Sequence, residues 1–536
     1  MKEHKILQNK IYLYLTEFFS GMSVMAVELG ASRLLAPYFS SSQIVWTIII
    51  GTIMIAMALG NVWGGRNADK NPNPDELYGR ILIAAIWIAA IPVLGKYIIL
   101  LISGVLIVTI SNQFLIIAAF ASCMIIFVFP LFLLGTVTPS LAKYAVGSLD
   151  DSGKTIGTLG AFNTIGSIIG TFVPTFVSIP AVGTSITFLI FAGILLALTL
   201  VYFISEKTHI IKSVIAVILF ILCCIFGHSG SFAFWETNLT YEGESVYNYL
   251  QVKDTEKSTI LSTNVLFGVQ SITMKEDTLT GMYYDYAMAA PLMCDNGADG
   301  SDILVLGNGT GTYATQCSEY FKDVDIEGVE IDESITDLAY EYFELSDDIE
   351  VTTYDGRAYL QAVDKEYDVI MVDAYQDITI PFQMSSVEFF ELVDEHLKDG
   401  GVMVVNMNMY TTGSEEMEAS INTYLADTIP EVFSDAYIVN VPHYTNRVLF
   451  ASNDADMIAN LKANTENLEY ADLQEIMDEV STNISAYESS GYILTDDKAP
   501  VELLGMEVID SLIESEIGYY KDIFKEEGLQ GLLDSL

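Results

Sequence analysis

The stretch ILVLGNGTG, residues 303–311, decides the fold of the second half of this chain. Four apolar residues followed by three alternate glycines, ahead of a helical pattern at 313–321, predict a buried strand, a tight turn and a helix. Glycines let the backbone come close to a ligand, and the first turn of a helix offers it free N–H groups. The motif alone is a weak signal, so its surroundings decide what it predicts.

Strand and helix patterns alternate on either side of this motif. Further buried strands are expected at 324–329, 349–353, 369–372 and 402–406, and helices at 334–343 and 386–397. Such alternation is typical of a parallel sheet with helices packed on it. Short β-rich runs ahead of the motif, at 247–252, 259–262 and 271–274, predict a small antiparallel sheet.

Three carboxylates stand at the ends of successive predicted strands: Glu330, Asp355 and Asp373. The carboxyl ends of parallel strands share one edge of the sheet, where open α/β sheets bind ligands. Glu330 follows the glycines by about 20 residues. In nucleotide-binding folds, an acid at this spacing in the sequence accepts the hydroxyls of a ribose. Each acid taken singly is explained as well by solvation, but the set predicts a nucleoside site.

The first 228 residues have the composition of a membrane domain. They hold 12 Lys and Arg against 9 Asp and Glu, whereas residues 229–536 hold 12 against 61, a net charge of −49. A bilayer needs about 20 apolar residues per helix, and seven or eight spans are expected. The candidates are 11–33, 43–64, 80–110 (one span or two short helices), 112–137, 156–180, 184–204 and 210–228. Glu28 inside the first span predicts a buried pair with Arg33 or a polar cavity, unless Arg33 is interfacial.

Composition also excludes several classes of protein. The acidic half is rich in Tyr, Phe, Ile and Val, so it is not a disordered acidic chain. No basic surface is available for a phosphate backbone, so no nucleic-acid partner is expected. Five cysteines without a C-x-x-C and scattered histidines argue against a disulfide scaffold and predict no metal site.

The number of spans decides the side of the membrane on which the acidic half lies. Seven spans put the Lys and Arg clusters on the side of the N-terminus and the acidic half on the other, as the positive-inside rule favours. Eight spans bring the acidic half inside but move Lys143, Lys154, Lys207 and Lys212 outside. Because the cofactor discussed below is made in the cytosol, we expect a multi-pass cell-membrane protein with a cytoplasmic catalytic domain.

Several stretches resemble the spermidine synthase (polyamine aminopropyltransferase) family. They are residues 244–247, 304–311, 329–332, 354–358, 367–375, 380–383 and 494–502. The chain is most similar to the membrane-fused branch of that family, in which a major-facilitator-like helical bundle precedes the synthase domain. LLGTVTP at 133–139 and GSIIGT at 166–171 resemble helices of that branch.

The resemblance implies a multi-pass α-helical membrane domain, for which the apolar segments predict seven or eight helices. An α/β Rossmann-like domain of S-adenosylmethionine type follows, with a small N-terminal antiparallel sheet. The expected domains are the membrane domain at 1–228, a connector and small sheet at 229–295, the nucleoside-binding catalytic domain at 296–455 and an acidic helical extension at 456–536. The implied partners are a polyamine or another amine and the lipid bilayer, with a homodimer left open.

The resemblance also implies residue roles. Asp373 would take a proton from the attacking amine, Glu330 would hold the ribose hydroxyls, and Asp355 with Gly356 would contact the adenine. The other cofactor-binding candidates are Gln270, Gly307, Gly309 and Gly311. The substrate-binding candidates are Tyr283, Asp285, Tyr375 and Asp377. The chain departs from the family pattern at Thr310 and Gln376, which leaves the amine and the donor open.

The implied reaction moves an aminopropyl group from decarboxylated S-adenosylmethionine to a polyamine, without a metal. An amine with a pKa near 10 must lose a proton before it attacks, and one carboxylate can accept that proton. The leaving group is a neutral thioether and needs no acid. Two alternatives stay open. One is a membrane-tethered methyltransferase that uses intact S-adenosylmethionine, and the other is a transporter or sensor with a nucleoside-binding regulatory domain.

Overall fold

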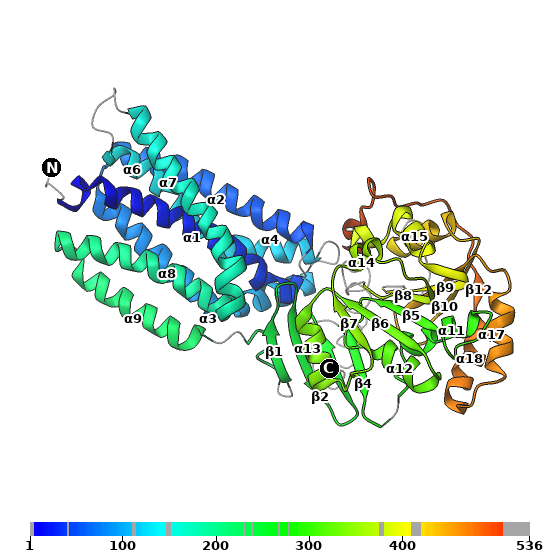
Figure 1. The fold of residues 1–536 in the computed structure, drawn as a ribbon. Helices are drawn as coiled ribbons and strands as arrows, with labels where there is room; N and C mark the ends of the chain where they lie inside the picture. The colour runs from blue at the N-terminus through cyan, green and yellow to red at the C-terminus, as the bar shows by residue number, and fades with distance from the viewer. Residues whose placement is uncertain are drawn as a thin grey trace. The chain divides into compact units, whose positions relative to one another are not determined.

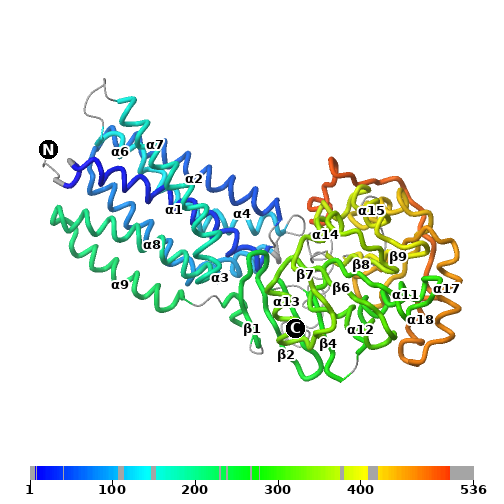
Figure 2. The backbone as a smooth tube through the Cα atoms, viewed as in Figure 1, coloured from blue at the N-terminus to red at the C-terminus, as the bar shows by residue number. Residues whose placement is uncertain are grey.

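The computed structural model describes residues 5–39, 42–109, 114–145, 152–228, 231–236, 239–265, 268–276, 278–374, 380–408 and 420–506. The chain divides into two compact units, Met1–Trp235 and Glu236–Leu536. Figures 1 and 2 trace their elements as a ribbon and as a tube. The finer domain limits expected from the sequence stay a prediction.

The first unit is helical, as the apolar composition predicts. Its helices are α1 (Lys10–Phe39), α2 (Gln43–Lys70), α3 (Pro74–Thr109), α4 (Phe114–Ile126), α5 (Val128–Gly135), α6 (Val137–Ala145), α7 (Ser152–Val173), α8 (Ile179–Glu206) and α9 (Ile210–Gly227). Within the described residues, six helical segments are long and apolar enough to cross a membrane, judged by length and composition. Many large apolar side chains of these helices, such as Ile211 and Leu101, face outward and are exposed.

Two long segments determine how often the chain runs along the bundle. The third predicted span is one helix, α3, rather than two short ones. Residues 152–206 are too long for one crossing, and the helix is interrupted at Gly183, where φ is 79°. Both α7 and α8 pack on α1, and the Ile6 N–H donates to Glu206 at 3.3 Å, so α8 returns to the end where α1 begins. When α4, α5 and α6 are counted together as one interrupted pass, the described residues run along the bundle seven times.

Most cations of the first unit gather at the end of the bundle where α1 begins. Lys143 near the end of α6 pairs with Asp69 near the end of α2 at 2.8 Å, which places both helix ends there. The described cations in this half are Lys10, Arg66, Lys70, Arg80, Lys143, Lys154, Lys207 and Lys212. Arg33 and Lys96 lie in the other half, where Lys96 donates to the carbonyl of Ser231 at 2.6 Å as the chain leaves the bundle.

The second unit begins with the predicted small antiparallel sheet. Its strands, in spatial order, are β1 (Leu239–Glu244), β2 (Tyr249–Asp254), β3 (Ser258–Ser262) and β4 (Ser271–Met274). The buried Asp332 joins this sheet to the rest of the unit, because it accepts a bond from Asn248 at 3.0 Å and caps the helix that follows it. Ser245 also donates to Asp332, so the stretch 244–247 contacts the stretch 329–332.

The main sheet is mixed rather than purely parallel. Its strands are β5 (Asp302–Leu306), β6 (Asp325–Glu330), β7 (Glu350–Thr353), β8 (Tyr367–Val372), β9 (Leu397–Met407), β10 (Asp435–Asn440), β11 (Arg447–Ser452) and β12 (Ser485–Ala486). In the described residues they follow the order β12-β10-β11-β9-β8-β5-β6-β7. Strands β5–β9 are parallel, and β10, β11 and β12 pair antiparallel. The central strands are buried on both faces, which agrees with their continuous apolar sequence.

Helices connect and cover these strands. They are α10 (Tyr283–Ala287), α11 (Ala289–Met293), α12 (Thr312–Tyr320), α13 (Glu333–Tyr342), α14 (Gly356–Ala362), α15 (Val387–Asp394), α16 (Ile421–Thr428), α17 (Met457–Thr465) and α18 (Ala471–Asn483). The C-terminal region, expected to be helical, contains α17 and α18, but β12 then pairs with β10 and extends the sheet.

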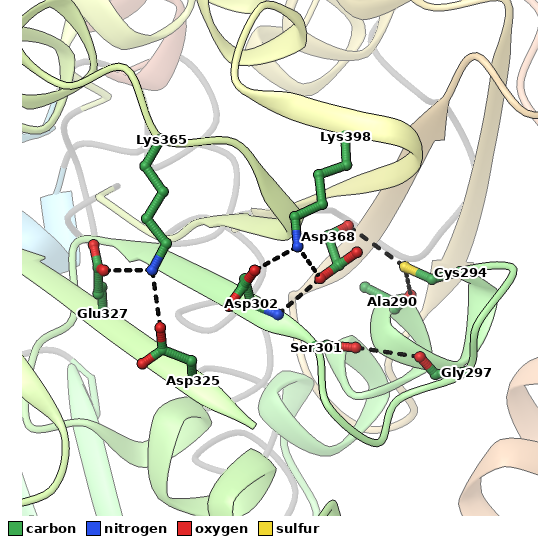
Figure 3. A network of polar contacts seen from close by, with 10 residues as sticks. All are labelled: Ala290, Cys294, Gly297, Ser301, Asp302, Asp325, Glu327, Lys365, Asp368 and Lys398. Atoms are coloured by element: carbon green, nitrogen blue, oxygen red, sulfur yellow. Dashed lines mark hydrogen bonds and ion pairs between the residues drawn. The ribbon is translucent and has the colours of Figure 1, made fainter. Parts of the chain in front are cut away.

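Acids in the amino-terminal halves of β5, β6 and β8 are neutralised by lysines (Figure 3). Lys365 pairs with Asp325 at 2.9 Å and with Glu327 at 2.6 Å. Lys398 pairs with Asp368 at 2.8 Å and with Asp302. Exposed pairs of this kind contribute about 0–1 kcal/mol each. These ion pairs matter here as a comparison, because the acids at the carboxyl ends of β6 and β8 have neutral hydrogen-bond partners instead of lysines.

Candidate active site

The glycine-rich turn and the strand-end acids lie at one edge of the sheet. Leu306 of β5 is in register with Val329 of β6 and Val372 of β8, so Gly307, Glu330 and Asp373 are neighbours. The turn requires glycine at its first position, because Gly307 has φ of 84° and a Cβ there would lie 2.5 Å from the Cα of Ala374. The structure thus brings together three of the predicted site residues.

Glu330 is bonded directly to the glycine-rich turn. Its Oε2 accepts the N–H of Gly309 at 2.9 Å, and its Oε1 accepts the N–H of Asp332 at 3.1 Å. The side chain is 7% exposed. Burial raises the pKa of Glu330 to about 7, opposed by these backbone N–H groups. The carboxylate is therefore held by neutral donors at the rim of the turn.

Asp373 is held by a tyrosine and an asparagine. Its Oδ2 accepts the hydroxyl of Tyr283 at 2.7 Å, and its Oδ1 accepts the Nδ2 of Asn406 at 2.9 Å. Asn446 in turn donates to Asn406 at 2.9 Å. Burial raises the pKa of Asp373 to about 7, against the lowering effect of Tyr283 and Asn406. Asp373 is of intermediate burial as a residue, so part of it remains accessible.

Asn406 and Asn446 are site residues that the sequence reasoning missed. Asn406 ends the predicted strand 402–406, so a polar residue at a strand end was the available signal. For Asn446 there was no such signal, because it precedes β11 and reaches Asp373 only through Asn406.

Asp355 and Gly356 begin α14, near two other motifs. Asp355 caps this helix by accepting the N–H of Ala358 at 2.9 Å. Arg357 makes a two-pronged ion pair with Asp496, at 2.7 and 2.8 Å, and donates to the carbonyl of Gln383 at 3.0 Å. The segments 380–383 and 494–502, far apart in sequence, therefore converge at the start of α14.

Two of the four predicted substrate-binding residues lie among the described residues. Asp285 is fully buried, and its carboxylate accepts bonds from Thr280, Gly281 and Gln316. These four bonds hold the carboxylate within the chain, and a role for Asp285 in substrate binding stays a prediction. Tyr283 donates its hydroxyl to Asp373. Tyr375 and Asp377 lie outside the described residues.

Buried polar atoms beside the glycine-rich turn lack partners within the described part of the chain. They are Oε1 of Gln270, Oγ1 of Thr310, and both Oδ1 and Nδ2 of Asn308. Buried polar atoms are normally hydrogen-bonded, and exceptions point to an absent ligand or water. A nucleoside with a polar tail would supply such partners, so these residues fit the expected cofactor. No group of three or more His, Cys, Asp or Glu among the described residues is arranged to hold a metal.

The comparisons with known proteins identify the family to which the chain belongs. The family model described as the spermine/spermidine synthase domain matches residues 282–463. A Bifidobacterium longum protein named a probable polyamine aminopropyl transferase is 53% identical over 354 residues, covering 63% of this chain and 78% of that protein. The polyamine aminopropyltransferase of Vibrio vulnificus is 25% identical over 243 residues, covering 44% and 78%.

Solved structures show a partial likeness. A probable spermidine synthase from Corynebacterium glutamicum has a TM-score of 0.36 and 19% identity, and covers 43% of this chain and 87% of its own. The spermidine synthase of Thermotoga maritima has a TM-score of 0.35 and 18% identity, and covers 45% and 83%.

Together, the fold, the domain match and the relatives define a transferase with a Rossmann-like domain of S-adenosylmethionine type. The chain belongs to the polyamine aminopropyltransferase family. Its long apolar helices precede the transferase domain in the sequence.

Proposed function

We propose that this protein is a membrane-bound aminopropyltransferase that uses decarboxylated S-adenosylmethionine and a polyamine. The observation that carries the proposal is the position of Glu330 and Asp373 at the ends of the two strands that flank β5. Both acids have neutral hydrogen-bond partners, whereas acids at the other ends of the same strands are paired with lysines. A sulfonium donor and an ammonium acceptor are both cations, and they would face these two acids.

The nucleoside would be bound around the glycine-rich turn. Glu330 accepts the ribose hydroxyls, Asp355 and Gly356 contact the adenine, and Gly307, Gly309 and Gly311 form the floor beneath the nucleoside. Gln270 contacts the tail of the donor. The unpartnered oxygen of Gln270 supports this assignment. The helix that begins after Gly311 adds the free N–H groups of its first turn.

Asp373 would serve as the base. It takes a proton from the ammonium or the attacking amine, and the freed nitrogen lone pair forms a bond to the propyl carbon next to sulfur. The carbon–sulfur bond breaks with its electrons going to sulfur, which leaves as a neutral thioether. A pKa near 7 makes Asp373 a better base than an ordinary aspartate at neutral pH. Tyr283 and Asn406 fix the orientation of its two oxygens.

Product analysis tests this proposal against both alternatives. Purified full-length protein is supplied with decarboxylated or intact S-adenosylmethionine and a panel of diamines, and the products are identified by mass spectrometry. We expect aminopropylated amine and methylthioadenosine from the decarboxylated donor. A methylated product from the intact donor would instead establish a methyltransferase. Nucleoside binding with no product from either donor would favour the sensor.

The topology of the first unit bears on where this reaction takes place. Under the positive-inside rule the cation-rich end of the bundle faces the cytoplasm. With seven passes the chain leaves the bundle at the other end, so the catalytic unit begins on the opposite side of the membrane. The donor, made in the cytosol, would then have to cross the membrane. The cytoplasmic position expected from the sequence would instead follow from an eighth pass or from a bundle whose cation-rich end faces outward.

Labelling of introduced cysteines tests this sidedness. Asp347 in the catalytic unit and Lys70 at the end of α2 are both exposed, so Asp347→Cys and Lys70→Cys offer matched thiols. A membrane-impermeant maleimide should label the first in intact cells and the second only after permeabilisation. The reverse pattern would put the catalytic unit in the cytosol. The native Cys294 and Cys317 are buried and cannot serve as probes.

A further inference from the structure

A buried carboxyl group in the first unit has no role in the reaction proposed above. Glu17 of α1 is 0% exposed. Its Oε1 accepts the hydroxyl of Thr138 in α6 at 2.6 Å and the Nδ2 of Asn163 in α7 at 2.8 Å. Its Oε2 is enclosed and has no hydrogen-bond partner among the described residues. Sequence reasoning selected Glu28 on the same helix, which is only partly buried.

Two serines continue the polar face that begins at Glu17. Ser20 and Ser23 follow at steps of three residues, so the three positions spread over about 120° of the surface of α1. Both hydroxyl oxygens are enclosed and lack partners in the described part of the chain, and the two residues are 2% and 0% exposed. A polar group inside an apolar bundle costs several kcal/mol unless a partner satisfies it. Three unpartnered oxygens in a row therefore indicate a site that a further molecule completes.

Of the helices around these oxygens, α7 packs closely against α1, whereas others are interrupted near the site. The backbones of α1 and α7 touch, because a Cβ on Gly166 would lie 2.0 Å from the carbonyl oxygen of Phe18. Next to the site, α5 ends at Gly135 and α6 begins at Val137. Further along, a π-helical turn, Pro174–Ser178, follows α7. Broken helices next to a buried polar site are typical of transporters, and π-helical turns often mark functional sites.

The chemistry of the site indicates which molecule would fit. The groups that contact Glu17 are a neutral hydroxyl and a neutral amide. The described residues contain no cluster of three His, Cys, Asp or Glu for a metal ion. The carboxylate of Glu17 can accept from an ammonium group, and the hydroxyl oxygens of Ser20 and Ser23 lie about 4.5 and 9 Å further along the helix axis. A matching ligand therefore carries an ammonium group and further N–H donors along its length.

We propose that the helical unit binds a protonated amine at Glu17 and exchanges it across the bundle. The choice of a polyamine as that amine rests on the proposed function, since the catalytic unit of the same chain would act on amines. The first unit would then be a polyamine carrier with its own binding site, separate in sequence from the transferase site.

Counterflow in proteoliposomes tests the proposal with the full-length chain. Vesicles are loaded with unlabelled spermidine or putrescine, and trace labelled amine is added outside. We expect accumulation that depends on the protein, and Glu17→Gln should lower it to the level of protein-free vesicles because the negative charge is lost. Glu28→Gln, the matched control on α1, should exchange amine like the wild type. Aminopropyl transfer by the same preparations verifies that the variants are folded.

The outcomes separate this inference from the proposed function. Asp373→Asn should lose aminopropyl transfer and keep amine counterflow, whereas Glu17→Gln should do the opposite. Absence of protein-dependent counterflow, or equal counterflow in wild type and Glu17→Gln, overturns the carrier proposal and leaves the transferase intact. Counterflow of labelled sodium without that of either amine overturns the choice of ligand.

Discussion

Asp373→Asn is expected to lower kcat for aminopropyl transfer by about 10²–10⁴-fold, the usual contribution of a general base. The amide can still accept or donate hydrogen bonds toward Tyr283 and Asn406, so the local structure should persist, but it cannot accept the amine proton. Binding of methylthioadenosine should change little, because Asp373 is not bonded to the glycine-rich turn. Steady-state kinetics and equilibrium binding on the same preparation measure both effects.

The matched control is Asp368→Asn on the same strand. Asp368 lies toward the amino end of β8 and pairs with Lys398 (Figure 3), so this variant removes a carboxylate from β8 without touching the site. It should retain wild-type kcat per folded molecule. Equal losses in the two variants would mean that β8 tolerates no such change, and that Asp373 has no special role.

The pH dependence gives a second readout for Asp373. Since burial raises its pKa to about 7, the base form increases as the pH rises through that value. For the wild type, kcat/KM should therefore rise about tenfold per pH unit below 7 and more gently above it. The step near 7 should be absent in Asp373→Asn. A wild-type profile that is flat between pH 5.5 and 7 would contradict the assignment of the base.

Glu330→Gln should weaken methylthioadenosine binding by about 1–3 kcal/mol, the cost of losing charge-assisted hydrogen bonds. Glutamine keeps the size of the side chain but offers one carbonyl oxygen where the carboxylate offers two. The N–H groups of Gly309 and Asp332 already use both oxygens of Glu330, so the variant cannot satisfy them and the ribose together. Isothermal titration calorimetry of the full-length protein measures the change.

Glu327→Gln is the control for this prediction. Glu327 lies on the same strand, β6, but its carboxylate pairs with Lys365 at the opposite edge (Figure 3). Its loss should leave methylthioadenosine affinity unchanged, although the free energy of unfolding decreases slightly. If Glu330→Gln also binds the nucleoside with wild-type affinity, the ribose site lies elsewhere.

The candidate site was predictable as far as it follows from strand ends. ILVLGNGTG identifies a strand and a turn, and the acids after three later strands must meet at one edge because parallel strands share their direction. The partners of those acids were not predictable. Tyr283 reaches Asp373 across 90 residues of sequence, and Asn446 reaches Asn406 across 40. Such contacts depend on packing between elements, which no local pattern records.

Asp285 and Glu17 also show that local sequence does not determine the surroundings of a side chain. Asp285 looked available in the sequence, but the turn at Thr280 and Gln316 of α12 occupy its carboxylate. The sequence predicted a buried role for Glu28 and none for Glu17, although both are acids in one apolar helix. The neighbouring helices determine which side of α1 is enclosed, and the sequence of α1 does not record their positions. The number of passes was likewise ambiguous, because the segment 80–110 could have been one span or two short helices until α3 proved to be a single helix.

The amino-acid sequence by itself determined a helical apolar first part, an α/β second part and the edge of the sheet that carries the nucleoside-type motif. These follow from hydrophobic periodicity, glycine conformation and strand direction, which are properties of short segments. The tertiary structure alone decided which acids are neutralised by lysines, which are left with neutral partners, and which oxygens lack a partner. Those properties depend on side chains brought together from distant segments, because the free energy of a buried charge depends on its surroundings in space.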